Sequence, residues 1–472
     1  MEAYLSSLRA LAATAEASQC AEVVKDGPRL VADARFDKVN LEGRVWILSS
    51  VVLCAVNERN ERVAFDGVGM LAPISTEDWP RHLRIVLAVE LNETEEAISA
   101  LRTWSQANPA AVSQMKTRSV WELLRKAGEL KGERDRRLEV HDILSQANYR
   151  SQEPFGIDAI RIEHARLLLQ NGRVSEARRR VEGIVKVVTH VEMAADRTFD
   201  PIRSDEKIDF AALAATEIES AVAVAKAHPR LLEARYREVQ AYRQAGRFND
   251  AVAAADAALA AVAADASQFD DSQEYVSWLH NDRAYSLYEL GRNDEGRAAM
   301  RAGIAAGEGG HPNVSQVINL AELLVDEGRL EEALAALKEL GHASAYGSMW
   351  AEAVRACAAA QNGDAATLEE ALAKLRENEK DNVAALQRSL LCGNQIEEAA
   401  ALYIKRLADP SLRDGALLAL QNWQEDPANL PFRKEVYRRL DVLRARPDVE
   451  AAIAAVGRVL DLPLIRAYWG SF

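Results

Sequence analysis

The sequence predicts an all-α fold in which one helical hairpin is repeated along the chain. The pattern Gly-Arg-x-x-(Glu/Asp)-Ala occurs at residues 172–177, 246–251 and 328–333, with a close variant at 291–296. Gly291 and Gly328 are 37 residues apart, half the 74 residues that separate the first two copies, so one unit of this length is copied. Apolar residues around these glycines recur with the helical period. Stacked hairpins of this kind form an α-solenoid.

The clearest hairpin spans residues 314–341. One apolar stripe precedes Gly328 and another follows it, and their members are Leu320, Leu323 and Leu324, then Leu330, Ala333, Leu334, Leu337 and Leu340. Gly328 can adopt the positive φ that ends the first helix, which a residue with a Cβ resists. Ala333 is small where the two helices would approach closely. The spacing therefore predicts two helices that meet at a tight turn.

The repeat pattern divides the chain into three parts. Residues 151–410 form the main array, while residues 1–150 carry weaker helical repeats. In residues 411–472 the glycine pattern ends and prolines interrupt the helices, which predicts a helical cap over the last apolar face. Turns in the first part are predicted at Gly27, 57–60, Asn92 and Gly128.

Within the array, the unit between the first two glycine motifs is degenerate. Residues 210–227 have the apolar period of a long second helix that ends before Pro229, whereas residues 195–207 are predicted as a loop. A second polar loop is predicted at 267–273, because the spacing between consecutive glycine motifs increases there.

These units resemble the tetratricopeptide repeat (TPR) family, in particular bacterial TPR-type α-solenoids. The resemblance rests on a helix that ends at glycine, an acidic pair and a small residue. It extends to residues 92–97, where Asn92 replaces the glycine and Pro109 closes the unit. Asn tolerates the left-handed conformation, so this replacement is physically reasonable. The resemblance implies a right-handed α-α superhelix in which the first helix of each hairpin lines a concave face where protein or peptide ligands bind.

Candidate groove residues follow from that implication by counting back thirteen, ten, six and three positions from the turn glycines. The set comprises Glu233, Tyr236, Gln240, Arg243, Trp278, Asn281, Tyr285, Tyr288, Glu322 and Trp350. Offsets of three and four place each subset on one helix face. Tyr, Trp and Arg are favoured anchors of binding energy, which supports a binding groove. The alternative is that the aromatic side chains pack between helices.

Charge and composition disfavour several partners. The formal net charge is −14, so the averaged field repels nucleic acid and anionic membranes. Basic strips at 125–137, 178–180 and 433–446 are interspersed with carboxylates and are interpreted as solvated helix faces. The longest apolar stretch, 45–56, is too short to span a bilayer. With no export signal visible we expect a cytoplasmic protein, or a periplasmic one if Met1 replaces a trimmed signal.

The four cysteines form two pairs separated by about one repeat, Cys20 with Cys54 and Cys357 with Cys392. Neighbouring helix axes lie about 8–10 Å apart, whereas a disulfide needs Cα atoms within about 7 Å. The sequence analysis therefore favours buried free thiols, with disulfides as the alternative.

The sequence contains no convincing motif for catalysis, metal binding or cofactor binding. Residues 67–72 fit the dinucleotide pattern G-x-G-x-x-A, but Pro73 follows at once and no strand pattern precedes them, which favours chance within a helical hairpin. The eight histidines lack metal-ligand spacing. We therefore expect no metal, no cofactor and no enzymatic activity. The predicted function is a scaffold that binds a protein or peptide partner. A helical-repeat regulator associated with nucleic acid, or an enzyme with an unrecognised site, are the alternatives.

Overall fold

The computed structural model describes residues 1–131, 135–203, 207–307 and 313–466. The chain divides into two compact units, Met1–Leu168 and Leu169–Phe472. The all-α prediction is confirmed, because helices build both units and only two short strands occur within the described ranges. Division of the sequence at residues 150 and 410 rests on pattern alone and stays a prediction.

Unit 1 consists of helical hairpins around two apolar clusters, one before and one after about residue 85. Its elements are α1 (Glu2–Glu16), α2 (Cys20–Val31), η1 (Phe36–Lys38), α3 (Leu41–Asn57), α4 (Glu61–Leu71), α5 (Trp79–Glu90), α6 (Thr94–Ala107), α7 (Pro109–Ser113), α8 (Thr117–Glu129) and α9 (Arg136–Gln146), and α10 (Asp158–Gln170) crosses into unit 2.

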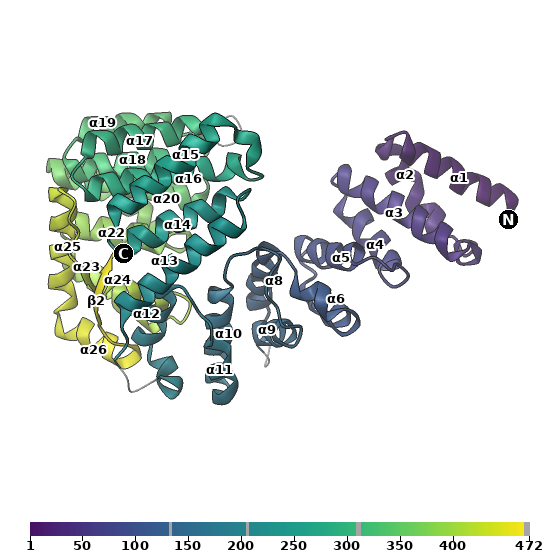
Figure 1. Ribbon diagram of the computed structural model, residues 1–472, viewed down its shortest axis with the longest axis horizontal. Helices are drawn as coiled ribbons and strands as arrows, with labels where there is room; N and C mark the ends of the chain where they lie inside the picture. Colours follow the sequence, from purple (N-terminus) through teal and green to yellow (C-terminus); the bar gives the residue numbers. More distant parts are fainter. Residues whose placement is uncertain (132–134, 204–206, 308–312, 467–472) are drawn as a thin grey trace. The chain divides into compact units, whose positions relative to one another are not determined.

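Unit 2 continues the hairpins and ends in a more irregular segment (Figure 1). Its helices before that segment are α11 (Val174–Val181), α12 (Val187–Ala195), η2 (Arg197–Ile202), α13 (Phe210–Ala227), α14 (Leu232–Gln244), α15 (Phe248–Ala264), η3 (Ala266–Gln268), α16 (Ser272–Glu289), α17 (Asn293–Ala306), α18 (Val314–Glu327), α19 (Leu330–Ala336), η4 (Leu337–Glu339), α20 (Ala345–Asn362), α21 (Ala365–Glu377), η5 (Glu379–Asp381), α22 (Val383–Cys392) and α23 (Ile396–Ala408). The C-terminal segment, residues 411–466, contains α24 (Arg413–Ala419), β1 (Asn422–Gln424), α25 (Pro431–Arg444), α26 (Pro447–Val456) and β2 (Asp461–Ile465).

A residue with positive φ marks the turn inside most hairpins. Glycine occupies this position at Gly172, Gly246, Gly291, Gly328 and Gly363. Other residues occupy it at Ser18, Arg59, Asn92 and Asn394. The predicted turn at Asn92 is thus confirmed, and the turn expected near 57–60 is centred on Arg59. Gly393 has a negative φ, so the last regular turn is formed one residue later than its glycine suggests.

A buried small or apolar residue follows each of these turns by five positions, except after Gly363. The residues are Val23, Ala64, Ala97, Ala177, Ala251, Gly296, Ala333 and Ala399. A Cβ on Gly296 would lie 2.7 Å from the ring of Tyr288, so glycine is needed in the hairpin whose first helix carries this large side chain. Close helix packing is therefore maintained in one register along both units.

Two predictions about irregular segments need correction. Gly27 is buried inside α2, where its position faces Val51, and it forms no turn. The predicted loop at 195–207 contains the 3₁₀ helix η2, which begins where the Asp196 side chain accepts a hydrogen bond from the Thr198 amide. The helix predicted at 210–227 is confirmed as α13. Parts of three predicted features, 132–134, 204–206 and 467–472, lie outside the described residues.

The preference for free thiols was wrong, because all four cysteines are bonded. Cys20 pairs with Cys54 and Cys357 with Cys392, with Cα–Cα distances of 4.7 and 5.0 Å. Axis separation overestimates Cα separation, since each Cα lies about 2.3 Å from its helix axis and facing positions approach each other. Cys20 is moreover the first residue of α2, so a helix end approaches α3.

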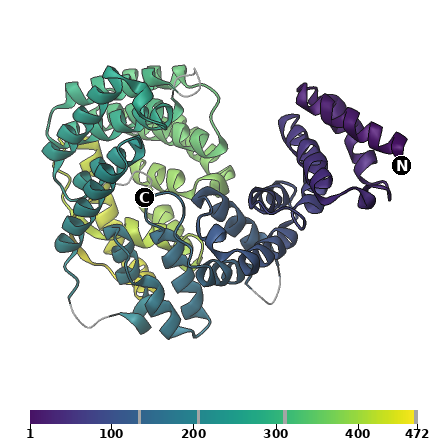
Figure 2. The same cartoon turned by 45° about the vertical axis from the view of Figure 1, so that its right-hand side comes forward.

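The C-terminal segment returns across the first helices of the hairpins, which we call the inner helices (α14, α16, α18, α20 and α22). Helix α25 packs against α18 and α22, and β2 packs against α13 and α14. Figures 1 and 2 both show this segment, in yellow, beside the green helices α22 and α23. β1 and β2 form a parallel pair. From Val252 onward, the array shares one large apolar core with α24, α25 and α26.

Candidate functional site

Four of the predicted groove residues keep solvent access. Tyr236 and Trp278 are partly buried, with ring centroids 6.4 Å apart, and Tyr275 lies 5.6 Å from Tyr236. The exposed Gln240 donates a hydrogen bond of 2.6 Å to the Tyr236 hydroxyl, and Glu233 forms an ion pair on the same helix. We call Tyr236, Gln240, Tyr275 and Trp278 the aromatic patch. It combines flat apolar faces with polar edges, a surface suited to protein or peptide contact.

The remaining predicted residues on α14 and α16 are buried. Arg243 forms an ion pair with Asp282 and lies over the ring of Tyr285, 5.0 Å from its centroid. Asn281 accepts a hydrogen bond of 2.8 Å from Asn319. The hydroxyl of Tyr288 donates to Glu327, which also pairs with Arg297. In this structure these side chains join helices to one another.

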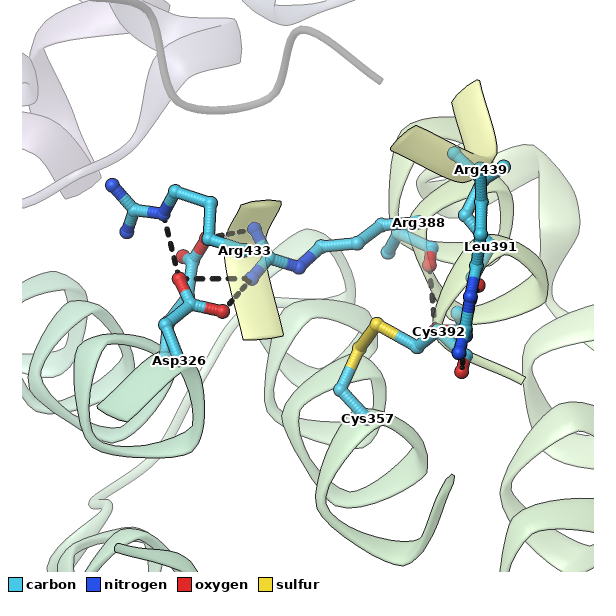
Figure 3. The surroundings of a disulfide bond; sticks show 10 residues. Asp326, Cys357, Arg388, Leu391, Cys392, Arg433 and Arg439 are labelled. Atoms are coloured by element: carbon cyan, nitrogen blue, oxygen red, sulfur yellow. Dashed lines mark hydrogen bonds and ion pairs between the residues drawn. A yellow bond between two sulfur atoms is a disulfide. The ribbon is translucent and has the colours of Figure 1, made fainter. Parts of the chain in front are cut away.

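Glu322 and Trp350 are also buried, and Glu322 belongs to an ion-pair network that links α18, α22 and α25. Arg388 pairs with Glu322 and, at 3.2 Å, with Asp326. Arg433 donates to the other oxygen of Asp326 at 2.8 Å and lies 3.6 Å from Asp426. Figure 3 shows Arg388 and Arg433 both pointing toward Asp326, with the Cys357–Cys392 disulfide nearby. We call these five charged residues the interior network.

The buried carboxyl group of Glu289 lies beside Asp426 of the interior network. Burial, and then the neighbouring carboxyl of Asp426, raises the pKa of Glu289 to about 8. Although burial opposes it, the charge of Arg433 holds the pKa of Asp426 below its ordinary value. At neutral pH Glu289 is therefore mainly protonated and Asp426 ionised, which avoids two adjacent buried negative charges.

Replacement of Glu289 by glutamine is expected to flatten the pH dependence of stability. The folded-state pKa lies above the ordinary value of 4.5, so the native chain holds an additional proton between pH 4.5 and about 8. The contribution of Glu289 is fully present below this window and is lost as pH rises through it, with a slope of up to about 1.4 kcal/mol per pH unit. Urea unfolding from pH 5 to 9 measures this slope, with the exposed Glu331→Gln as control. Equal slopes in wild type and Glu289→Gln would contradict the assignment.

Sequence reasoning missed the residues that matter most in the interior network. Arg388 occupies the inner-face position six residues before a turn, as Glu322 and Tyr285 do, but its turn residue is Asn394 rather than Gly393. Recognising asparagine at that turn would have found it. Asp326 and Glu289 each precede a turn glycine by two residues, a position the count omitted. Arg433 lies 107 residues from Asp326, and no local pattern connects them.

In the basic strips at 125–137 and 433–446, most described arginines pair with carboxylates. Arg125 pairs with Glu122 and Glu129. In the last strip, Arg433 is buried, Arg438 pairs with Glu435, and Arg446 pairs with Glu397 and Asp448. Such pairing leaves little free positive charge for phosphate contacts. Within the described ranges, no group of three or more metal-ligating side chains is present, and no helix is long and apolar enough to cross a membrane.

The hairpins, with their common turn and packing register, are TPR-like. No protein-family model matches the sequence, and no curated protein matches it significantly. Among solved structures, yeast Tom70 is similar, with 11% identity and a TM-score of 0.34 over 96% of this chain and 99% of that chain. A Rap protein complexed with Competence and Sporulation Factor has 10% identity and a TM-score of 0.31 over 94% and 98%. The APC/C hetero-tetramer Cut9–Hcn1 has 11% identity and a TM-score of 0.28 over 92% and 96%.

Proposed function

We propose that this chain is a non-enzymatic scaffold that binds a protein or peptide partner at the inner-helix face of unit 2. The observation that supports it is the aromatic patch, where Tyr236 and Trp278 remain accessible although neighbouring groove positions are buried. Large aromatic side chains with one accessible face are the residues that most often dominate interface energetics. The buried ion pair of Arg243 and Asp282 adjoins the patch, because Asp282 also interacts with the Tyr236 side chain.

Nucleic-acid binding is a weaker candidate for the same chain. Its support would come from the basic strips, but in the strips at 125–137 and 433–446 arginines such as Arg125, Arg438 and Arg446 are paired with carboxylates and Arg433 is buried. The net charge of −14 opposes a polyanionic partner as well.

Bonding of both cysteine pairs favours residence in an oxidising compartment, such as the periplasm, over the cytoplasm. Structural disulfides persist where glutathione and thioredoxin do not reduce them.

The double variant Tyr236→Ala, Trp278→Ala is expected to lose partner capture at least a hundredfold. Each interface anchor contributes about 2 kcal/mol or more, and every 1.4 kcal/mol is a factor of ten in affinity. Quantitative mass spectrometry of pull-downs measures the capture, with circular dichroism and melting as folding checks.

Trp46→Ala provides the matched control, since Trp46 is an exposed tryptophan of unit 1. Loss of capture with Trp46→Ala and not with the double variant would place the interface on unit 1. Arg243→Ala and Tyr288→Ala are expected to impair folding instead, because both side chains are buried.

A further inference from the structure

Helix α25, which packs against α18 and α22, combines an apolar face with arginine side chains. Its buried face carries Phe432, Val436, Leu440 and Leu443 in one apolar stripe, with Arg433 beside it. In its C-terminal half, Arg439 donates to the carbonyl oxygens of Leu391 and Cys392 at 2.9 and 2.5 Å, which satisfies the last carbonyls of α22. Helix α25 is thus an arginine-bearing amphipathic helix.

The charge of the receiving surface matches this helix. Without α25, the ion pairs between α18 and α22 set two carboxylates, Glu322 and Asp326, against one guanidinium, Arg388. Arg433 supplies the second positive charge at Asp326, which is fully buried. An uncharged occupant would leave a buried carboxylate with an incomplete set of partners, which is strongly unfavourable.

We infer that this surface of unit 2 is a receptor for arginine-bearing amphipathic helices, with α25 as its resident occupant and a partner helix of the same kind as its competitor. The inference rests on the proposed binding function and assigns a partner chemistry to the same inner-helix face. Helix α25 exposes Lys434 and Arg438 on its outer side, and the residues before it, 424–429, are mostly exposed. Its advantage over a competitor is the tether, which sets a local concentration of the order of millimolar.

A labelled peptide of residues 429–446 tests the inference on the purified full chain. The Arg433→Gln chain weakens its own resident helix and leaves Asp326 short of a partner. It is expected to bind the wild-type peptide at least a hundredfold more tightly than the wild-type chain does. A peptide with Arg433→Gln should lose this binding, whereas a peptide with Arg438→Gln, altered only at the exposed arginine, should retain it. Fluorescence anisotropy measures all three peptides.

Hydrogen exchange keeps the result interpretable, because it shows whether α25 opens while α14 and α16 stay protected. If Arg433→Gln does not fold, Arg433→Met retains the apolar stem without the charge and takes its place. Failure of an exchange-open variant to bind the wild-type peptide would overturn the inference, and so would equal binding of the peptides with and without Arg433. Neither result depends on Tyr236 or Trp278, so this test can fail while capture through the aromatic patch succeeds, and the reverse.

Discussion

Asp326→Ala is expected to lower the free energy of unfolding of unit 2 by about 3–5 kcal/mol, the range found when one partner of a buried ion pair is removed. Asp326 is fully buried and receives both Arg388 and Arg433. Its removal leaves two guanidiniums in the interior with only Glu322 and the more distant Asp426 to compensate them. Urea unfolding monitored by far-UV circular dichroism measures the loss.

Asp294→Ala is the matched control, since the Asp294 side chain is 93% exposed although it pairs with Arg297. Its effect is expected to stay within about 0.5 kcal/mol. If the two alanine variants unfold at the same urea concentration, the interior network is hydrated in solution and does not hold α25 in place. Asp326→Asn should be milder than Asp326→Ala, because the amide oxygen still accepts a hydrogen bond.

The double variant Cys357→Ala, Cys392→Ala is expected to destabilise unit 2 by about 2–4 kcal/mol, the usual contribution of a disulfide. The bond joins α20 to α22, two inner helices, and Cys392 lies at the end of α22 where Arg439 donates to its carbonyl. A less constrained α22 also weakens the position of Arg388 (Figure 3).

Cys20→Ala, Cys54→Ala offers a direct comparison in unit 1. The two bonds close loops of almost equal length, with sequence separations of 34 and 35, so chain entropy predicts similar losses. Melting of the wild-type protein with dithiothreitol, compared with melting without it, should reproduce both losses of stability. Detection of four reactive thiols in the denatured, unreduced protein would contradict the bonding and restore the prediction of free thiols.

Local sequence was sufficient for the hairpins. Turn glycines such as Gly328, the small residue five positions later, and the apolar stripes on either side are short-range signals, because a helix and its turn depend mainly on neighbours within a few residues. Helix α13 was therefore predicted with its observed bounds. The turn at Ser18 escaped detection, since serine does not signal a left-handed conformation, whereas the turn at 57–60 was predicted without identifying Arg59 as its central residue.

The candidate site could be predicted only in part, for a related reason. Counting from the turn glycines placed Tyr236 and Trp278 on one face, and the structure brings their rings together. The same count placed Tyr288 and Glu322 on that face but could not show that they are buried. Helical periodicity specifies which side a residue faces, and it carries no information on what covers that side.

The sequence by itself determined a helical repeat chain and the register of those hairpins whose turns carry a glycine motif or Asn92. Only the tertiary structure decided that α25 covers α18 and α22, that Asp326 pairs with Arg433 across 107 residues, and that Cys357 reaches Cys392. The physical reason is one of range. Turns and helices follow from steric and hydrogen-bonding preferences within a few residues, whereas burial and charge pairing depend on segments that meet only after the chain has folded back on itself.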